Sequence, residues 1–469
     1  MKEEHAQDNN SSTEETSNSD EKRSLEQKTS SDTSTSSSGN DTTKTDSKRA
    51  ISNGTDQQEQ SDLVNRILSL LIMVSVVVVA FWLRSQNKKD VVEKKLSMVV
   101  VPELFVTGSE GSQRRDNIDS LVVLNHQWLI TTAKATNSLF VFDAKTGEYL
   151  FTKHLKTGDY EANRPNGITL HKIFNKDYLF VTERDGKRVC IVDIENDFKI
   201  LYSFGSEILQ RPYALDIVKT EKSLGPNTEH YHVFVTDNYM LQDERGKHKI
   251  VPPQHLLDKR VQLFEVAVTK KEATQITFEA SYSKKIGSIT EDVGPSSGTL
   301  NIVETIVIDE AYNRLLIADE HELNVKIYNF KSHDFSGETL GMTSTPAPSD
   351  KTKCPKSFFF EGEPEGFVIF SCQTSHPARN VKTGFYIFTD QLDKRTKFHI
   401  VRRDNLCYVA SFMGNVVSKT DGVTIDETLG IFYAVHNDSV IGTFKLDDIV
   451  QNVIKKNLDS SAFKKICPL

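Results

Sequence analysis

Carboxylates and cations recur at the edges of short apolar runs through residues 103–446 of this chain. The residues that open the first run of each pair are Asp116, Asp119, Arg164, Asn166, Arg211, Tyr213, Glu304, Glu363, Glu365, Lys419 and Asp421. Those that close the second run are Lys134, Glu183, Arg184, Asp237, Asp319, Glu320, Asp390, Gln391 and His436. Hard cations prefer carboxylate oxygens, and Arg and Lys bind phosphate oxygens. The mixture suits a site where Ca²⁺ bridges to phosphate and activates water.

A purely structural interpretation of the same residues stays open. Turns are polar in any protein, and an Asp or Asn in a turn often bonds only to nearby backbone. Other catalytic motifs are missing from the sequence: there is no G-x-S-x-G, no H-E-x-x-H and no G-x-x-x-x-G-K-[ST]. The histidines are scattered, and His399 reads as a strand residue rather than a ligand. Spacing alone therefore favours a site without identifying its reaction.

The elements that must position these residues form a unit that is repeated six times. Each unit has two apolar runs, and it is clearest in residues 362–391. The six units are residues 116–134, 164–184, 211–237, 303–320, 362–391 and 419–436, and a third β-rich run follows each. The spacing of roughly 50 residues is typical of propeller blades, and three β-rich runs per unit indicate an antiparallel meander. We predict an all-β domain, a six-bladed β-propeller.

This fold predicts where the polar residues meet. In a blade, the innermost strand crosses the ring and the second strand returns, so the start of one and the end of the other share a rim. Polar residues far apart in sequence are thereby gathered around the central channel. Residues 103–108 are expected to join the last blade and close the ring, and residues 240–259 and 343–356 to form surface loops.

Charge and cysteine content limit the function classes. The formal charge of the chain is −8, but residues 1–60 hold 13 acidic and 7 basic residues, so the remainder is close to neutral. This balance gives no support to nucleic-acid binding. The five cysteines form no C-x-x-C pair, which argues against a zinc site. Cys354 and Cys372 are able to pair in an oxidising compartment, and unpaired buried thiols are an equal alternative.

The first hundred residues predict a tail and a membrane anchor. Residues 1–61 are almost entirely polar, and such a stretch is expected to be disordered. Within the predicted transmembrane helix at 62–85, residues 67–83 are uncharged and apolar, which is close to the length that spans a bilayer. Residues 86–100 read as a linker, 101–450 as the propeller, and 451–469 as a C-terminal tail. A short helix is expected at 447–456, across the end of the propeller.

Orientation signals for this single-pass protein conflict. Five basic residues follow the apolar span and three precede it, so the positive-inside rule places the propeller in the cytoplasm. A tail of sixty polar residues is awkward to translocate, and an anchored hydrolase usually faces outward. We expect a lumenal or extracellular propeller.

The C-terminal half resembles the β-propeller phytases and their phytase-like relatives. The resemblance rests on EPEGFVIFSC at 363–372, GFYIFTDQ at 384–391, TDGV at 420–423 and FYAVHN at 432–437, in the family's order. LLIADE at 315–320 and VETIVI at 303–308 match more of the pattern, with Thr305 in place of a glycine. Similarity covers residues 103–446 and is strong over 303–446.

The resemblance implies a six-bladed propeller and Ca²⁺-dependent hydrolysis of phosphate monoesters on inositol hexakisphosphate, by metal-activated water. It implies catalytic and metal-ligand roles that are shared by Glu304, Glu320, Glu365 and Asp421. It implies substrate phosphate contacts by Lys134, Arg184 and Tyr213. The expected partners are a phytate-like phosphorylated small molecule and, through one helix, a membrane.

The chain also departs from the family pattern. The family's paired aspartates at the opening of the first repeat are replaced by Asp116-Asn117, and its Lys–Glu pair after the third repeat by Asp237-Asn238. These losses leave a second hypothesis, a non-catalytic interaction propeller displayed on a membrane. A third is a propeller hydrolase that acts on another ester or a lactone.

Overall fold

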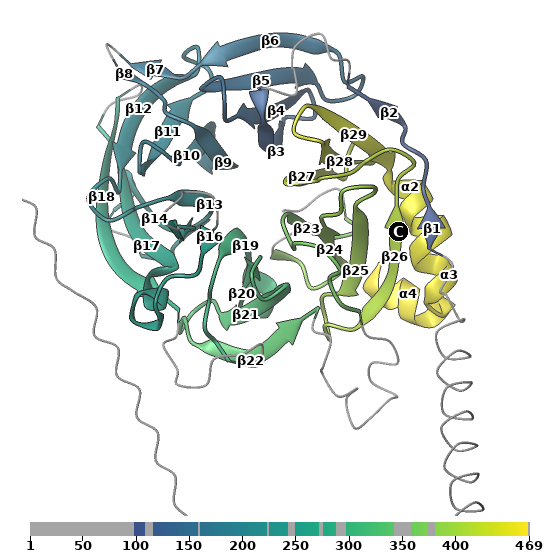
Figure 1. Cartoon of the computed structure of the whole chain (residues 1–469). Coiled ribbons are helices and arrows are strands. Elements are labelled where there is room, and N and C mark those ends of the chain that lie inside the picture. The colour runs from purple at the N-terminus through teal and green to yellow at the C-terminus, as the bar shows by residue number, and fades with distance from the viewer. Residues whose placement is uncertain are drawn as a thin grey trace, which may run out of the picture. The chain divides into compact units, whose positions relative to one another are not determined.

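The computed structural model describes residues 98–107, 116–157, 160–222, 225–242, 249–271, 275–287, 297–341, 358–373 and 380–467. These residues form six sheets around a central axis, which confirms the predicted six-bladed β-propeller (Figure 1). The predicted tail, the apolar span 67–83 and the surface loop 343–356 lie outside the described residues. Within the described residues, no helix is long and apolar enough to cross a membrane.

Each blade is a meander whose innermost strand comes first in sequence. Blade 1 is β3 (Ile118–Leu124), β4 (Trp128–Ala133), β5 (Ser138–Asp143) and β6 (Tyr149–His154); blade 2 is β9 (Pro165–Ile173), β10 (Lys176–Glu183), β11 (Arg188–Asp193) and β12 (Lys199–Phe204). Blade 3 is β13 (Pro212–Lys219), β14 (Thr228–Asp237), β17 (Val261–Lys270) and β18 (Ile276–Ile286); blade 4 is β19 (Val303–Asp309), β20 (Arg314–Asp319), β21 (Asn324–Asn329) and β22 (Phe335–Leu340).

The last two blades are completed by the N-terminal end of the domain. Blade 5 is β23 (Phe367–Phe370), β24 (Phe385–Asp390), β25 (Lys397–Arg402) and β26 (Tyr408–Met413), with β1 (Val99–Val100) at its outer edge. Blade 6 is β27 (Val423–Asp426), β28 (Ile431–His436) and β29 (Val440–Lys445), with β2 (Phe105–Val106) as its fourth strand. The prediction that residues 103–108 close the ring is thus confirmed over β2.

The second strand of each blade is apolar on both faces because both faces are buried between blades. In β10, Leu179 and Val181 pack in the cluster shared with blade 1, whereas Tyr178 and Phe180 pack in the cluster shared with blade 3. Side chains alternate between the two faces of a strand, so a one-residue slip would exchange the two sets of neighbours. The continuous apolar runs in the sequence therefore fix the register of each blade.

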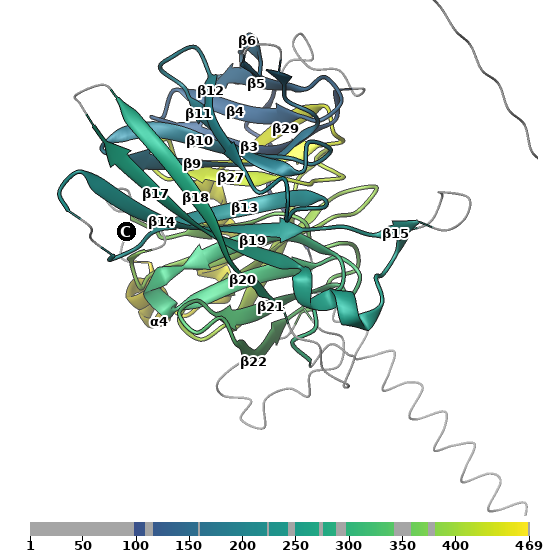
Figure 2. The same ribbon diagram turned by 90° about the vertical axis from the view of Figure 1, so that its left-hand side faces the viewer.

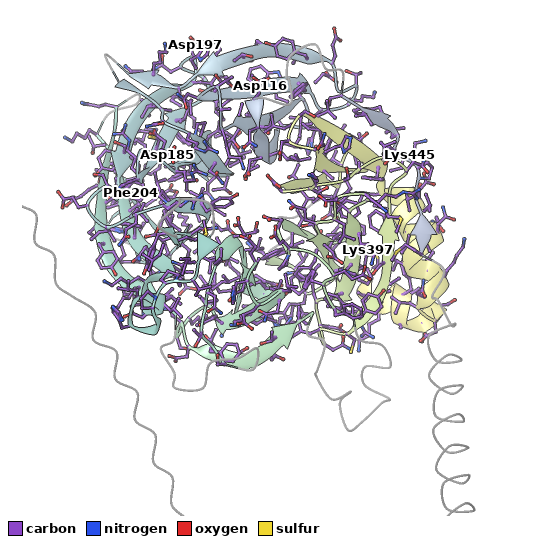
Figure 3. All side chains as sticks on the ribbon, viewed as in Figure 1. Asp116, Asp185, Asp197, Phe204, Lys397 and Lys445 are labelled. Carbon is purple, nitrogen blue, oxygen red and sulfur yellow. A yellow bond between two sulfur atoms is a disulfide. The ribbon has the colours of Figure 1, made fainter. Side chains whose placement is uncertain are left out.

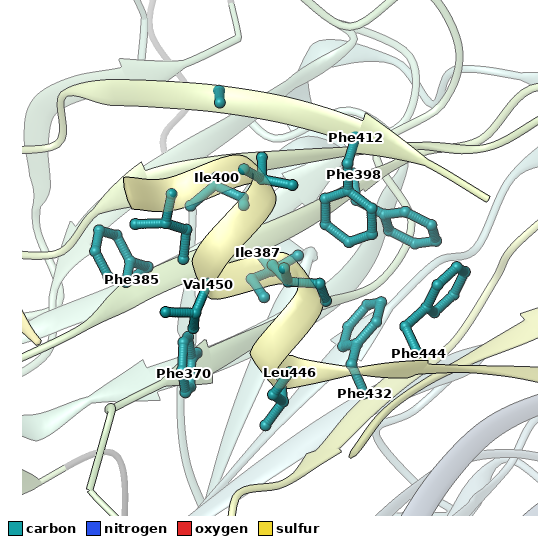
Figure 4. Packing of buried hydrophobic residues seen from close by; sticks show 14 of the residues in the cluster. Phe370, Phe385, Ile387, Phe398, Ile400, Phe412, Phe432, Phe444, Leu446 and Val450 are labelled. Carbon is teal, nitrogen blue, oxygen red and sulfur yellow. The ribbon is translucent and has the colours of Figure 1, made fainter. Parts of the chain in front are cut away.

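Helices after blade 6 cover one side of blades 5 and 6. They are α2 (Leu446–Ile449), the π-helical turn η5 (Val450–Ile454), α3 (Lys455–Asn457) and α4 (Ser460–Ile466). Leu446 and Val450 enter a cluster that includes Phe370, Phe398 and Phe432 (Figure 4). The short helix predicted at 447–456 is confirmed, but the residues after 450 pack into this core.

A disulfide fastens the end of this helical segment to the ring. Cys467 bonds to Cys372, which lies just after β23. The proposed pairing of Cys372 with Cys354 is therefore wrong, because the C-terminal helices bring a cysteine 95 residues away in sequence against blade 5. Cys190 is a buried free thiol.

The insertion between the second and third strands of blade 3 is more ordered than the predicted surface loop. It contains a hairpin of β15 (Leu241–Gln242) and β16 (Lys249–Ile250), followed by a 3₁₀-helix, η2 (Gln254–Lys259). Figure 2 shows β15 standing away from the ring. The insertion leaves the ring at the end of β14, on the face where second strands end. A second short hairpin pairs β7 (Lys156–Thr157) with β8 (Tyr160–Glu161).

Candidate active site at one mouth of the channel

An inner ring of six side chains surrounds one mouth of the central channel, one from the same register position of each blade. In blades 1 to 4, this residue directly follows the first residue of the innermost strand to pair with the end of the second strand. In blades 5 and 6, it lies two residues before the innermost strand begins. The inner ring is Asp119, Asn166, Tyr213, Glu304, Glu365 and Asp421. Figure 3 looks along the channel and shows side chains of all six blades around the central opening.

A local bulge and a threonine place the inner-ring residues. The register of blades 1 to 4 shifts where the inner-ring residue lies, and such bulges re-aim side chains. In blade 2, the bulged amide of Gly167 donates to Thr182 Oγ1 at 2.8 Å. The same hydroxyl donates to the carbonyl oxygen of Tyr213, in the next blade, at 2.5 Å. Thr132 and Thr236 repeat this bridge, which explains the threonine that recurs at the end of the second run.

Small residues directly after the inner ring let neighbouring inner strands approach closely. They are Ser120, Gly167, Ala214, Thr305, Gly366 and Gly422. A Cβ atom on Gly422 would lie 2.2 Å from the carbonyl oxygen of Asp119, and one on Gly167 would lie 2.4 Å from that of Tyr213. Below this layer, the channel is a cavity of about 660 Å³ lined by inner strands of all six blades.

An outer ring comes from the residue that ends the second strand or follows it. Its members are Lys134, Arg184, Asn238, Glu320, Gln391 and His436. Several of them contact the inner-ring residue of the next blade. Asn238 Nδ2 donates to Glu304 Oε1 at 2.5 Å, and Gln391 Nε2 donates to Asp421 Oδ1 at 2.5 Å.

Lys134 is the central cation of the mouth. Its ammonium group donates to Asp119 in its own blade and lies 3.4 Å from Asp421 Oδ2 of blade 6. Its side chain is only 7% exposed. Burial opposes the charged form, but the two aspartates outweigh it and raise the pKa of Lys134. The ammonium group also lies 5.7 Å from the centre of the Tyr213 ring.

The acidic groups exceed this single cation. Burial, followed by the charges of Asp421 and Glu320, raises the pKa of Glu365 well above its usual value. Burial also raises the pKa of Asp421, with Lys134 acting against it and Asp119 with it. The pKa of Tyr213 is raised by burial and by Glu304 and other inner-ring carboxylates. Its hydroxyl therefore stays protonated, as a hydrogen-bond donor facing the acids.

Six of the seven residues singled out from the sequence interact at this mouth: Lys134, Tyr213, Glu304, Glu320, Glu365 and Asp421. Arg184 stands slightly apart, with its Nε atom 2.9 Å from Asp185 Oδ1. The guanidinium groups of Arg164 and Arg211 feel the charge of Arg184. Burial lowers the pKa of both groups, and the positive charge of Arg184 lowers it further. Arg211 also interacts electrostatically with Tyr213 and Glu304, so this arginine cluster borders the acidic mouth.

The candidate rim residues of the sequence included Asp119, Asn166, Gln391, Arg164 and Arg211, but no specific role was assigned to them, and Asn238 was not a candidate. Their signal was the shared offset within the repeat, which places Asp119 and Asn166 in register with Tyr213. Within the described part of the chain, the buried side-chain oxygens of Asn166 and Asn238 accept no hydrogen bond. Buried polar atoms are normally satisfied, so these two amide oxygens are available to a ligand or water.

The oxygen donors at the mouth are of the kind that binds a hard cation, but the side chains lie too far apart to hold one in this structure. Carboxylate and amide oxygens are what Ca²⁺ prefers, and it takes six to eight of them. Across the ranges that the structure describes, no three His, Cys, Asp or Glu side chains lie close enough together to hold a metal ion. Asp119 and Asp421 are instead compensated by Lys134.

Comparison with known proteins adds no family. No protein-family model matches the chain, and no curated protein matches it.

Proposed function

We propose that this protein is a membrane-anchored, phytase-like phosphomonoesterase that hydrolyses phosphate esters such as inositol hexakisphosphate with Ca²⁺. The observation that carries the proposal is the gathering of Lys134, Tyr213 and four carboxylates at one mouth of the channel. These are residues to which the phytase resemblance, which covers residues 103–446 and is strong over 303–446, assigns roles. These residues are scattered over about 300 positions of the sequence, and the propeller fold alone does not require charged side chains at all of them.

The division of charge across the mouth suits a phosphate monoester. Blades 1 to 3 contribute Asp119, which Lys134 compensates, and the cations, which are Lys134, Arg164, Arg184 and Arg211. Blades 4 to 6 contribute Glu304, Glu320, Glu365 and Asp421. Guanidinium and ammonium groups bind phosphate oxygens, and the Tyr213 hydroxyl is a further donor.

The carboxylates of blades 4 to 6 are the proposed Ca²⁺ ligands. Burial, together with the charges of neighbouring acids, raises the pKa of Glu365 and Asp421. A bound cation would offset the repulsion between these acids, and it would activate water and neutralise phosphate charge. The amide oxygen of Asn238, which follows β14 of blade 3 and lies beside Glu304, would be a neutral oxygen ligand next to these carboxylates. Gln391 orients the carboxylate of Asp421, and Lys134 holds the carboxylates of Asp119 and Asp421.

Phosphate release from inositol hexakisphosphate by the purified full-length protein tests this proposal. We expect release in Ca²⁺ and none in excess chelator. Glu365→Gln and Asp421→Asn should each lower kcat by about 100-fold or more, because each removes a charge at the reacting centre. Glu279→Gln, at an exposed position of β18 on the outer edge of blade 3, is the matched control and should leave the rate unchanged.

Loss of activity in Glu279→Gln, or full activity in Asp421→Asn, would contradict the assigned site. A folded protein that binds inositol hexakisphosphate but releases no phosphate would favour the interaction propeller. That alternative is favoured by the internal compensation of Asp119 and Asp421 by Lys134. A substrate panel of carboxylic esters and lactones separates the third hypothesis.

We also propose that the propeller faces the lumen or the cell exterior. The disulfide between Cys372 and Cys467 supports this orientation, because structural disulfides persist in oxidising compartments and are rare in the cytosol. Thiol labelling of the full-length protein in intact cells, with and without reductant, tests it.

A further inference from the structure

A second layer of buried acids lies behind the two rings. In blades 2 to 5, the last residue of the second strand is acidic and accepts hydrogen bonds from the backbone that enters the first strand. These bonds join Glu183 to Asn163 N at 3.2 Å, Asp237 to Arg211 N at 2.7 Å, Asp319 to Asn301 N at 2.8 Å and Asp390 to Gly362 N at 2.6 Å. Each acid therefore fixes the entry to the strand that carries an inner-ring residue.

Each buried acid also meets a group from the third strand of its blade or from just before it. Arg188 Nε lies 3.3 Å from Glu183 Oε2, and Lys326 Nζ lies 3.5 Å from Asp319 Oδ2. Asp237 interacts electrostatically with Arg260. In blade 5 the partner is His399, whose Nε2 lies 3.1 Å from Asp390 Oδ2. Blade 5 thus replaces a permanent cation with an imidazole in the blade that carries Glu365.

The imidazole of His399 is held in one orientation. A carboxylate only accepts, so Nε2 carries the proton towards Asp390, and Nδ1, 2.5 Å from Ser411 Oγ, accepts from that hydroxyl. Phe358 lies against the ring with 4.7 Å between centroids, and Tyr408 bonds to Ser411 at 2.8 Å. Ser411 is 8% exposed and covered by these groups, so the Asp–His–Ser order does not present a nucleophile.

Asp390 connects this imidazole to the mouth in two directions. Its carboxylate accepts from the backbone N–H groups of Glu361 and Gly362, at the start of the segment that leads to Glu365. The next residue, Gln391, donates its backbone N–H to the carbonyl of Glu363 at 2.9 Å and its side chain to Asp421. Movement of Asp390 would therefore shift one inner-ring carboxylate and release the partner of another.

We propose that His399 is a positioning residue. Acting through Asp390, it fixes residues 361–365 and Gln391 and thereby sets the places of Glu365 and Asp421 at the mouth. Its effect on turnover rests on the proposed function, whereas its effect on the segment does not.

Hydrogen exchange of single backbone amides in the full-length protein tests the structural half. His399→Phe keeps a ring in the aromatic pocket but removes the N–H donor, and we expect the Glu361 and Gly362 amides to exchange at least about tenfold faster. His399→Gln retains a donor and should restore slow exchange. The amides of Asn301 and Ile302, which donate to Asp319 in blade 4, are the internal control and should not change.

Kinetics test the second half. In His399→Phe, kcat for phosphate release should fall roughly 10- to 100-fold with little change in KM, and His399→Gln should recover most of it. Unchanged exchange at Glu361 and Gly362 would overturn the inference whatever the activity. Faster exchange with wild-type kcat would also overturn it. Faster exchange of the blade 4 amides as well would indicate a general loss of stability, and a second variant then decides. Tyr408→Phe removes the hydrogen bond to Ser411 but leaves Asp390 in place. For the inference to stand, the Glu361 amide must still exchange slowly in this variant. A wild-type protein without phosphatase activity refutes the proposed function and leaves the exchange result decisive.

Discussion

Lys134 shows how one residue sets the electrostatics of the mouth. Its ammonium group is buried and offsets two aspartates from different blades. Removing one partner of a buried ion pair is far more costly than the net value of the pair, because the other charge is left without compensation. The same cation is a proposed phosphate contact, so stability and function meet in one side chain.

We predict that Lys134→Met lowers the free energy of unfolding by about 3–5 kcal/mol at pH 8. The folded pKa of Lys134 is raised, so its contribution is complete at and below neutral pH. Burial already raises the folded pKa of Asp421 in the wild type, and loss of the opposing Lys134 charge should raise it further. Protonation then favours the folded state, and the deficit should narrow between pH 8 and pH 5.

Denaturant unfolding of both proteins at the two pH values measures this effect. Lys172→Met, which breaks the exposed Lys172–Asp177 pair, is the matched control, and it should change stability by less than about 1 kcal/mol. A deficit of Lys134→Met that is independent of pH would contradict the role assigned to the two carboxylates.

At the scale of the element, the inner strands explain both what the sequence predicted and what it left out. The alternation of apolar runs and turns predicted six blades, because strands that are buried on both faces must be apolar along their whole length. It also placed Asp119, Asn166, Tyr213 and Glu365 at strand starts. The bulge that brings Asn166 and Asp119 into register depends on tertiary contacts with the next blade, such as Thr132 to Asn166, and has no local signal.

The C-terminal cap escaped prediction for a related reason. Cys372 and Cys467 are 95 residues apart, and their meeting depends on how a short helical segment packs on blades 5 and 6. A helix was predicted at residues 447–456, but the prediction of a helix does not identify the surface that it covers. Similarly, His399 looks like any strand histidine until Asp390 and Ser411 are placed on its two nitrogens.

The close approach of inner strands gives a prediction for Gly422. A Cβ atom there would lie 2.2 Å from Asp119 O and 2.9 Å from Ser120 Cα, both backbone atoms of the next blade. Gly422→Ala should therefore push blades 6 and 1 apart, cost about 1–3 kcal/mol and displace Asp421. Thermal unfolding and phosphate release measure the two effects. Thr305→Ala, at the same register position of blade 4, should be nearly neutral, and equal losses in both variants would argue against a steric cause.

At the scale of the whole molecule, the ring is closed by a segment held by one carboxylate. Glu103 accepts hydrogen bonds from the backbone N–H groups of Asn415, Val416 and Val417 at 2.9–3.1 Å. Burial acts to raise the pKa of Glu103, but these three donors outweigh it and lower the pKa below its usual value. The closure is therefore coupled to the ionisation of this side chain.

We predict that Glu103→Gln lowers stability by about 1 kcal/mol at pH 7, a figure reduced for the partial exposure of the group. A carboxyl whose folded pKa is lowered stabilises the protein above its unfolded pKa, and this contribution is lost as pH falls through the folded pKa. Wild type and variant should thus converge near pH 3 in thermal unfolding. Glu148→Gln, at an exposed turn of blade 1, is the control. A difference that persists at pH 3 would contradict this role of Glu103.

The same closure has a consequence in time during synthesis. Phe105 pairs with Thr443, 338 residues later in the chain. At about 5–20 residues per second, β1 and β2 wait roughly 17–70 s after they are made before their partner strands exist. Throughout that interval, Val101 and Phe105 are apolar side chains without a blade to bury them, and unpaired strands invite wrong partners. The first strands of the domain therefore cannot pair until almost the whole propeller has been made.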